Sequence, residues 1–198
     1  MIDMAKKILP ELILASESPR RRELLARAGY RFKVVPSNID EAAFSIGGLS
    51  PCQYAEKLAL AKAGKIAGDF PDAVVIGADT IVDSNGKIVG KAADAKEAEA
   101  IIRMLFARPH YVITGLAILW INKNIRIVES VSTTVYPKKL SEEQIAQYIK
   151  SNLWKGKAGA YGIQETAEEF VERIDGSLTN VMGFPMERLM EILNSLIE

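Results

Sequence analysis

The hydrophobic and polar positions of the first third of the chain predict strands and helices in turn. Glu11–Ala15 is a short apolar run typical of a buried strand. It leads into Ser16–Arg22 and a helix that ends at Gly29, a residue type that commonly follows a helix. Arg31–Pro36 alternates like a strand. Ser37–Ser50 is polar and contains glycine, so it predicts a loop.

The middle of the chain predicts two helices around a hairpin. Pro51–Ile66 has the pattern of a helix, and Ala73–Val82 is a strongly apolar strand. Asp83–Gly86 is a hairpin turn signal, so Lys87–Gly90 is expected to be the return strand. The apolar spacing in Asp94–Phe106 predicts a helix that Asp94 caps.

The remaining residues add a long hairpin and two helices. Tyr111–Ile121 and Ile125–Tyr136 flank a turn and predict the hairpin, and Ser141–Ile149 opens with a capping-box pattern. Three further segments are an irregular, glycine-rich Lys155–Gln164, a short strand Phe170–Ile174 and a closing amphipathic helix Pro185–Leu196. Because strands and helices interleave while hairpins also occur, the predicted class is α/β of the mixed α+β kind, with a largely mixed sheet.

Composition then excludes several classes of function. The chain has 198 residues, 48% of them hydrophobic, so we expect one domain over residues 1–198, with a single lobe or two. The 25 basic and 25 acidic residues balance, which provides no global field for nucleic acid or a membrane surface. The single Cys52 cannot form an internal disulfide, and neither a signal peptide nor a membrane span is apparent. These features favour a cytoplasmic protein.

The segment Ser18–Arg22 places cations where a helix normally avoids them. Ser18 is a favoured N-cap and Pro19 fits the first helical position, so three arginines fall in the first turn, where the helix dipole is already positive. This crowding predicts a receptor for an anion, and phosphate fits best. The alternative is a solvated surface turn, or ion pairs with Glu17 and Glu23.

Asp79 lies within the apolar run Val74–Val82, where an unpaired carboxylate is costly. We interpret Asp79 as a metal ligand or general base, with Gly77 and Ala78 small so that a ligand can approach the strand. The alternative is a structural aspartate that leaves the sheet at a bulge and caps a turn. Because His110 is the single histidine, triad and multi-histidine zinc chemistries are poorly supported.

Other charged residues can reach the same place. Lys91 follows the return strand, which brings it back toward Asp79, and Lys62 lies on a helix face of small residues from which it can reach inward. Both are also compatible with ordinary surface lysines. Asp40 and Glu41 form an acidic pair that suits a metal or a substrate hydroxyl, although acidic loop residues are commonly just solvated.

The segment Lys157–Gln164 combines small residues with a lysine and an amide. Small residues permit close backbone approach, so the segment suits a phosphate or base cradle. It has neither the Walker spacing nor a dinucleotide fingerprint. The alternative is that its glycines only allow two backbones to cross closely.

Six motifs carry a resemblance to a known family. They are Ser16-x-Ser18-Pro19-Arg20-Arg21-x-x-Leu24-Leu25, Gly77-Ala78-Asp79-Thr80, Gly90-Lys91 with Asp94, His110-x-Val112-x-Thr114-Gly115, Lys157-Ala158-Gly159-Ala160-Tyr161-Gly162-Ile163-Gln164, and Gly176-Ser177 with Asn180-Val181. In this order and spacing they resemble the Maf family of nucleoside triphosphate pyrophosphatases, from about Leu12 to Leu193.

The resemblance implies an elongated, two-lobed mixed α/β fold related to the inosine triphosphate pyrophosphatases, with a cleft between the lobes. It implies hydrolysis of a nucleoside triphosphate between the α and β phosphates, with Mg²⁺ or Mn²⁺ as cofactor. Asp79 is then expected to be the catalytic proton acceptor. The expected substrate-binding residues are Ser18, Arg20, Arg21, Lys62, Lys91, Lys157 and Gln164, and the expected metal ligands are Asp79 and Glu41.

This chain departs from the family pattern at four places. Glu17 replaces a usual glycine, Ala92 a usual proline and Phe184 a usual leucine. Leu153-Trp154 stands where a glutamate followed by Pro or Trp is common. If that glutamate helps to bind metal or nucleotide, affinity or turnover is reduced here, and Trp154 could stack on a base instead.

The choice of substrate and a rival function stay open at this point. Family members prefer dTTP and UTP or modified and methylated guanine nucleotides, and the form of Ala160–Gln164 resembles the dTTP/UTP group. The rival is a non-catalytic nucleotide-binding regulator of septum formation, which the loss of the glutamate at Leu153 keeps open. A nucleic-acid-binding module is disfavoured by the zero net charge. A homodimer is common for proteins of this kind.

Overall fold

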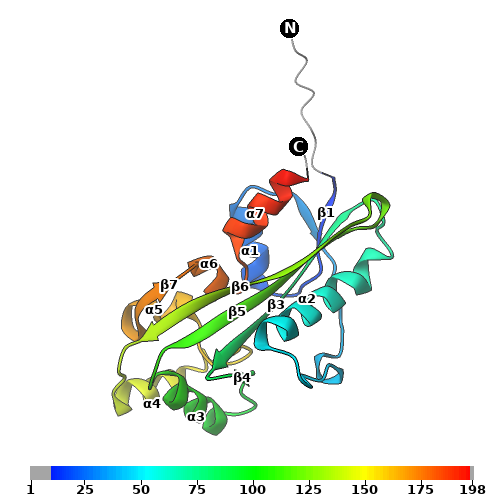
Figure 1. The fold of residues 1–198 in the computed structure, drawn as a ribbon. Coiled ribbons are helices and arrows are strands. Elements are labelled where there is room, and N and C mark those ends of the chain that lie inside the picture. Colours follow the sequence, from blue (N-terminus) through cyan, green and yellow to red (C-terminus); the bar gives the residue numbers. More distant parts are fainter. Residues whose placement is uncertain (1–9, 197–198) are drawn as a thin grey trace.

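The computed structural model describes residues 10–196, apart from the side chains of residues 165–168 (Figure 1). The strands are β1 (Leu12–Leu14), β2 (Phe32–Val34), β3 (Val74–Ser84), β4 (Lys87–Val89), β5 (His110–Trp120), β6 (Ile125–Pro137) and β7 (Val171–Asp175). The helices are α1 (Pro19–Arg27), α2 (Pro51–Ala67), α3 (Ala95–Leu105), α4 (Glu142–Ser151), α5 (Ile163–Phe170), α6 (Leu178–Val181) and α7 (Met186–Ser195). Two 3₁₀ turns cover Glu41–Ala43 and Ile121–Lys123.

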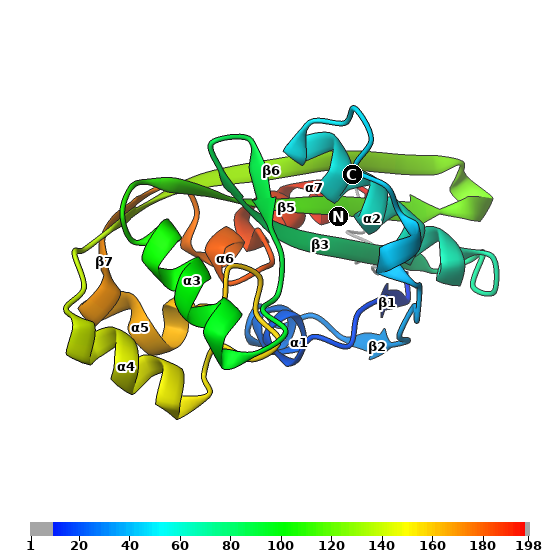
Figure 2. The same ribbon diagram turned by 90° about the horizontal axis from the view of Figure 1, so that it is seen from below.

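One mixed sheet contains all seven strands, in the order β2-β1-β3-β5-β6-β7, with β4 paired to β3. The β1 strand is parallel to β2 and β3, whereas the pairs from β3 through β7 are antiparallel. Strands β3, β5 and β6 are long and run through the whole molecule (Figures 1 and 2). The predicted mixed α/β class is therefore confirmed.

Helix α2 packs unusually close to one face of the sheet because two glycines face it. A Cβ atom added at Gly77 of β3 would overlap the backbone of α2 at Ala59, and one added at Gly115 of β5 would overlap its backbone at Ala55. Gly77 is thus small to admit a helix and Ala78 is fully buried in a core cluster, so the interpretation that both admit a ligand is wrong.

The opposite face of the sheet is covered by different helices at its two ends. Helices α1 and α7 bury a cluster that includes Leu25, Leu116 and Leu189 at the end near β1. Helices α3, α4 and α5 pack around Ile102 and Phe170 at the other end. Figures 1 and 2 show these two groups of helices at opposite ends of the long strands. The sheet thus joins two separately packed halves.

Most predicted elements agree with the structure to within two residues, and two short helices were not predicted. The irregular segment Lys155–Gln164 ends earlier than expected, because α5 begins at Ile163. Helix α6 is a single turn that Ser177 caps by accepting from the Asn180 backbone N–H at 3.0 Å. Among the described residues, no helix combines the length and apolar character needed to cross a membrane.

Candidate active site

The site lies where one edge of strand β3 is interrupted. Along this edge, β1 pairs with Val74–Ile76 and β4 pairs with Val82–Ser84, while β5 occupies the other edge. In the part of the chain that the structure describes, residues 77–81 therefore have no strand neighbour on the first side. A cavity of about 680 Å³ opens at this gap, a size typical of small-molecule sites.

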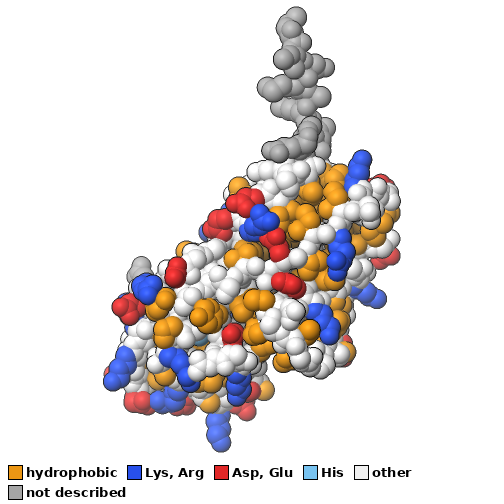
Figure 3. Space-filling model, viewed as in Figure 1, with side chains coloured by type: hydrophobic (Ala, Val, Ile, Leu, Met, Phe, Trp, Pro, Cys, Tyr) orange, Lys and Arg blue, Asp and Glu red, His pale blue; other side chains and the backbone are white. Residues whose placement is uncertain are grey.

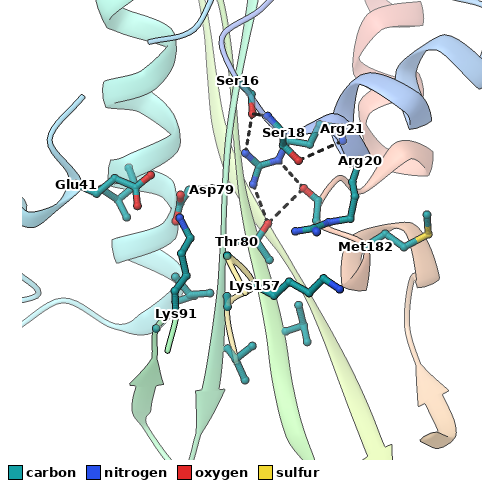
Figure 4. Close-up of a pocket in the computed structure, with 18 of the residues that line it drawn as sticks. Ser16, Ser18, Arg20, Arg21, Glu41, Asp79, Thr80, Lys91, Lys157 and Met182 are labelled. Carbon is teal, nitrogen blue, oxygen red and sulfur yellow. Dashed lines mark hydrogen bonds between the residues drawn. The ribbon is translucent and has the colours of Figure 1, made fainter. Parts of the chain in front are cut away.

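The cavity has two walls because neighbouring residues of a strand point to opposite faces of the sheet. Asp79 faces α2, and Thr80 faces the start of α1 (Figure 4). The gap in the sheet lets one cavity reach both. All the predicted site residues line it: Ser18, Arg20, Arg21, Glu41, Lys62, Asp79, Lys91, Lys157 and Gln164.

On the α2 wall, Asp79 is 6% exposed and is paired with Lys62. The Lys62 Nζ donates to Asp79 Oδ1 at 2.5 Å and lies 2.7 Å from Glu41 Oε1, so one ammonium bridges both carboxylates. Asp79 stays in register opposite Gly115 of β5. The alternative of a bulge that caps a turn is therefore wrong, and the cost of burying this carboxylate is offset by Lys62.

Glu41 reaches Asp79 from the loop between β2 and α2. Partial burial opposes its ionisation, but the hydrogen bond from Lys62 and the charges of Lys62, Lys91 and Arg21 outweigh burial and lower the pKa of Glu41. The neighbouring Asp40 does not line the cavity. Its carboxylate accepts from the Ala42 backbone N–H at 3.1 Å and caps the 3₁₀ turn.

On the opposite wall, the Arg21 side chain connects three segments of the chain by hydrogen bonds. Its guanidinium donates to Ser16 Oγ at 3.1 Å, to Ala78 O at 2.8 Å, to Thr80 Oγ1 at 3.0 Å and to Gly183 O at 2.8 Å. The Ala78 carbonyl lies in the unpaired part of β3, where Arg21 takes the place of a strand partner. Burial lowers the pKa of Arg21, against the opposing charges of Asp79 and Glu41.

The other residues of the α1 start are arranged as the sequence predicts. Ser18 Oγ accepts from the Arg21 backbone N–H at 3.4 Å and caps the helix. Arg20 is half-buried and points with Lys157 into the space below Thr80 (Figure 4). Arg22 is exposed and does not line the cavity. Two of the three arginines thus face the site.

Lys91 and the segment after Gly156 close the cavity from the other half of the molecule. Lys91 forms a β-bridge with Ala158, and its side chain extends toward Asp79 (Figure 4). Gly159 donates its backbone N–H to Gly90 O at 2.9 Å and packs against Val82. The segment therefore crosses the β4 connection closely and also lines the cavity, so both interpretations of its small residues hold.

His110 holds this segment in place from behind. Its Nε2 lies 2.7 Å from the Tyr161 hydroxyl and its Nδ1 lies 3.2 Å from Leu105 O, which favours the tautomer with the proton on Nδ1. Burial lowers the pKa of His110 and keeps the ring neutral. Tyr161 lines the cavity, but His110 does not. His110 is thus a positioning residue.

The departures at Leu153 and Trp154 lie away from the site. Leu153 is 42% exposed and neither residue lines the cavity. Trp154 is buried in the core around α3 and α4 and donates its indole N–H to Ile149 O at 3.1 Å. The suggestion that Trp154 stacks on a base is therefore wrong, because the turn after α4 directs its ring into the core.

Sequence reasoning assigned no role to several residues whose role depends on distant partners. Thr80 links Arg21 to Thr114 Oγ1, which lies 3.0 Å away, and Thr114 in turn donates to Asn180 O at 3.2 Å. Tyr54 lines the cavity and donates its hydroxyl to Phe44 O at 3.2 Å. The available signal for Thr80 was its position next to Asp79, as a polar residue in an apolar strand.

This chain is similar in sequence to known proteins. A sequence model of the family described as "Maf-like protein" matches residues 11–196. The "dTTP/UTP pyrophosphatase" of Pelotomaculum thermopropionicum is 41% identical over 185 residues, covering 93% of this chain and 96% of that protein. The protein of the same name from Geobacillus sp. (strain WCH70) is 44% identical over 180 residues, covering 91% of this chain and 95% of that protein.

A solved structure of a HAM1 protein from Coxiella burnetii aligns with a TM-score of 0.47 and 14% sequence identity, covering 94% of this chain and 98% of that one.

Proposed function

Because this chain belongs to the Maf-like protein family, we propose that it is a nucleoside triphosphate pyrophosphatase that prefers dTTP and UTP. One observation carries the proposal. Cationic side chains from four separate segments line the cavity that the buried carboxylate of Asp79 also lines: Arg20 and Arg21, Lys62, Lys91, and Lys157. A triphosphate is the ligand that such a cavity suits best, because several phosphate oxygens can be neutralised at once.

In the proposed reaction, water attacks the α-phosphorus and the bond from that phosphorus to the oxygen shared with the β-phosphate breaks. The products are a nucleoside monophosphate and pyrophosphate. Asp79 Oδ1 faces the point between the two carboxylates, which Lys62 occupies here, so we assign Asp79 Oδ2 as the atom that accepts the proton of the attacking water. A buried, fixed base of this kind contributes by its position as well as by its basicity.

The cations stabilise the charge that builds on the leaving pyrophosphate. Arg20, Lys91 and Lys157 come from α1, from the residues after β4 and from the segment before α5, so they surround an extended triphosphate. Arg21 supplies a fixed positive charge at the gap in β3 while its hydrogen bonds hold the wall. Ser18 contributes by capping the helix that carries both arginines.

The acidic pair fits a divalent cation. Asp79 and Glu41 present hard oxygen ligands to one bridging point, now held by Lys62 Nζ. Magnesium is usually bound by one or two carboxylates together with substrate phosphates, and the described residues contain no group of three His, Cys, Asp or Glu that would hold a metal alone. When bound, Mg²⁺ or Mn²⁺ would neutralise phosphate charge and lower the pKa of a water ligand.

The base is proposed to lie near the start of α5. Gln164 is exposed at the cavity and offers both a donor and an acceptor to a pyrimidine ring or to the sugar. The preference for dTTP and UTP is supported by the names of the relatives. The alternative substrates are modified or methylated guanine nucleotides.

A substrate panel tests this proposal directly. The protein is incubated with Mg²⁺ and, separately, dTTP, UTP, dCTP, GTP and 7-methyl-GTP, and the products are separated by anion-exchange chromatography. We expect monophosphate and pyrophosphate, with kcat/KM highest for dTTP and UTP. Release of orthophosphate, or equal kcat/KM for the guanine nucleotides, would contradict the assignment.

No structural observation favours the rival of a non-catalytic regulator of septum formation. That alternative rests on Leu153, which lies outside the cavity. A cytoplasmic location, a homodimer and the absence of nucleic-acid partners stay predictions.

A further inference from the structure

Lys62 occupies a position that its expected role as a phosphate ligand does not explain. Its side chain is 11% exposed, and its ammonium contacts Asp79 Oδ1 and Glu41 Oε1 at 2.5 and 2.7 Å. These are the two carboxylates that fit a divalent cation. An ammonium and a metal ion cannot occupy the same point, so one must leave before the other arrives.

The same contact holds a loop against the site. Glu41 lies in the polar segment between β2 and α2, and its side chain is 44% exposed. Helix α2 grips this segment at three points: Tyr54 donates to Phe44 O, Lys57 donates to Ser45 O, and Lys62 pairs with Glu41. Only the contact of Lys62 also reaches the strand that carries Asp79. Lys62 therefore fixes the spacing of the two carboxylates.

The surroundings of this pair discourage a free metal ion. The charges of Lys91 and Arg21 act on Glu41 together with that of Lys62. A bare divalent cation at the pair is repelled by these positive charges. A cation already bound to a triphosphate brings several negative charges with it, and those charges are attracted to the same lysines and arginine.

We propose that Lys62 is the resident counter-ion of the Asp79–Glu41 pair in the substrate-free protein and that it yields this position to a divalent cation only when the cation arrives with a nucleotide. This inference rests on the proposed function and adds an order of binding to it. In this scheme Lys62 is a positioning residue in the resting state. Its flexible stem and three donors then let the displaced ammonium pair with a phosphate oxygen.

Manganese binding to the protein without nucleotide tests the inference. Free Mn²⁺ is followed by electron paramagnetic resonance while wild-type protein and Lys62→Met are titrated at pH 8. Methionine keeps the volume of the side chain but removes its charge. We expect the variant to bind Mn²⁺ at least about tenfold more tightly than the wild type, because the competing cation is gone. Equal or weaker binding by the variant would overturn the proposal.

Three further variants separate the effect of the Lys62 charge from that of loop release or misfolding. Lys57→Met removes a lysine that grips the same loop outside the cavity, and it should bind Mn²⁺ like the wild type. Lys62→Arg retains the charge and should also resemble the wild type. If Lys62→Met does not fold, Lys62→Gln carries the test, since it is neutral but still polar and should also bind Mn²⁺ more tightly. Tighter binding by Lys57→Met would show that loop release, and not charge, is responsible.

A second arm uses a dTTP analogue with a methylene group between the α and β phosphates. After correction for the Mn²⁺ that the analogue binds in solution, wild-type protein should bind Mn²⁺ at least about tenfold more tightly with the analogue present than without it. No gain would refute the proposed order of binding. The proposed hydrolysis is tested separately by the products from dTTP, so the two failures are distinguishable.

Discussion

At the scale of single residues, neighbouring side chains of one type do different work. Arg20 is half-buried and points into the cavity (Figure 4). Arg21 is buried and donates four hydrogen bonds, to Ser16, Ala78, Thr80 and Gly183. The sequence could predict an anion site from their position in the first turn of a helix. It could not separate the two roles, because the partners of Arg21 lie up to 162 positions away.

Arg20→Ala should weaken triphosphate binding without affecting the fold. A charged hydrogen bond to phosphate is worth about 1.5–3 kcal/mol, so we expect the Kd of a non-hydrolysable dTTP analogue to rise roughly 10- to 150-fold. Isothermal titration calorimetry measures this change, and thymidine serves as the control ligand. An equal loss for thymidine would argue that Arg20 does not contact phosphate.

Arg21→Ala should instead cost stability. Removing a buried guanidinium leaves the Ala78 carbonyl without this donor and leaves Gly183 O with Thr80 Oγ1 at 3.3 Å, and we expect the free energy of unfolding to fall by roughly 3–5 kcal/mol. Urea denaturation followed by circular dichroism measures the change, with the exposed Arg22→Ala as the matched control. A loss below 1 kcal/mol would mean that the four hydrogen bonds do not brace the wall.

At the scale of elements, neighbouring residues in the sequence were sufficient to predict the caps and turns that depend on local contacts. The caps at Ser18, Ser50 and Ser141 and the positive φ angles of Asn85 and Gly86 follow from neighbouring residues. Helix α5 was missed because its first turn follows a glycine-rich segment and is held by tertiary contacts, with Ile163 in the core around α3 and α4.

The glycines under α2 give an element-scale prediction. Gly77→Ala should push α2 away from β3 and separate Lys62 from Asp79, with a loss of stability of roughly 1–3 kcal/mol or more from overpacking. Gly64→Ala, at an open position of the same helix, should be neutral or stabilising by up to about 1 kcal/mol. Thermal unfolding of both variants tests this contrast, and similar behaviour of the two would refute it.

The contact between His110 and the segment before α5 gives a pH dependence. Burial lowers the pKa of His110 below its usual value of about 6.5, so the unfolded chain binds a proton more readily than the folded protein. The free energy of unfolding should therefore be highest at pH 7 and above and should decline as the pH falls from 7 to 5. This range lies above the usual pKa values of carboxyl groups. His110→Gln should flatten the profile. Equal slopes for variant and wild type would exclude His110 as the cause.

At the scale of the whole molecule, the site depends on both halves. Asp79, Lys62 and Arg21 come from the half near β1, while Lys91, Lys157 and Gln164 come from the side of β4 and α5. Every residue that was predicted for the site lines the cavity, including Lys62 and Glu41, which lie outside the six motifs. The sequence alone could not predict the gap in β3 or the bridge by Lys62, because both depend on how β1, β4 and α2 meet around one strand.

The expected single domain has a measurable consequence. Since β3, β5 and β6 run continuously through both halves, disrupting one half should disrupt the other. We expect one cooperative unfolding transition, with Trp120 and Trp154 fluorescence coinciding with far-ultraviolet circular dichroism. The two tryptophans report on opposite halves. Two resolved transitions would contradict a single domain.

The rate of dTMP and pyrophosphate release from dTTP by Asp79→Asn, measured beside Asp83→Asn, tests the central claim most directly. Asp83 lies on the same strand and outside the cavity, so it controls for loss of an acidic residue from β3. We predict that Asp79→Asn lowers kcat by roughly 10²- to 10⁴-fold, while Asp83→Asn stays near the wild-type rate. A wild-type rate for Asp79→Asn would show that this cavity does not carry out the hydrolysis.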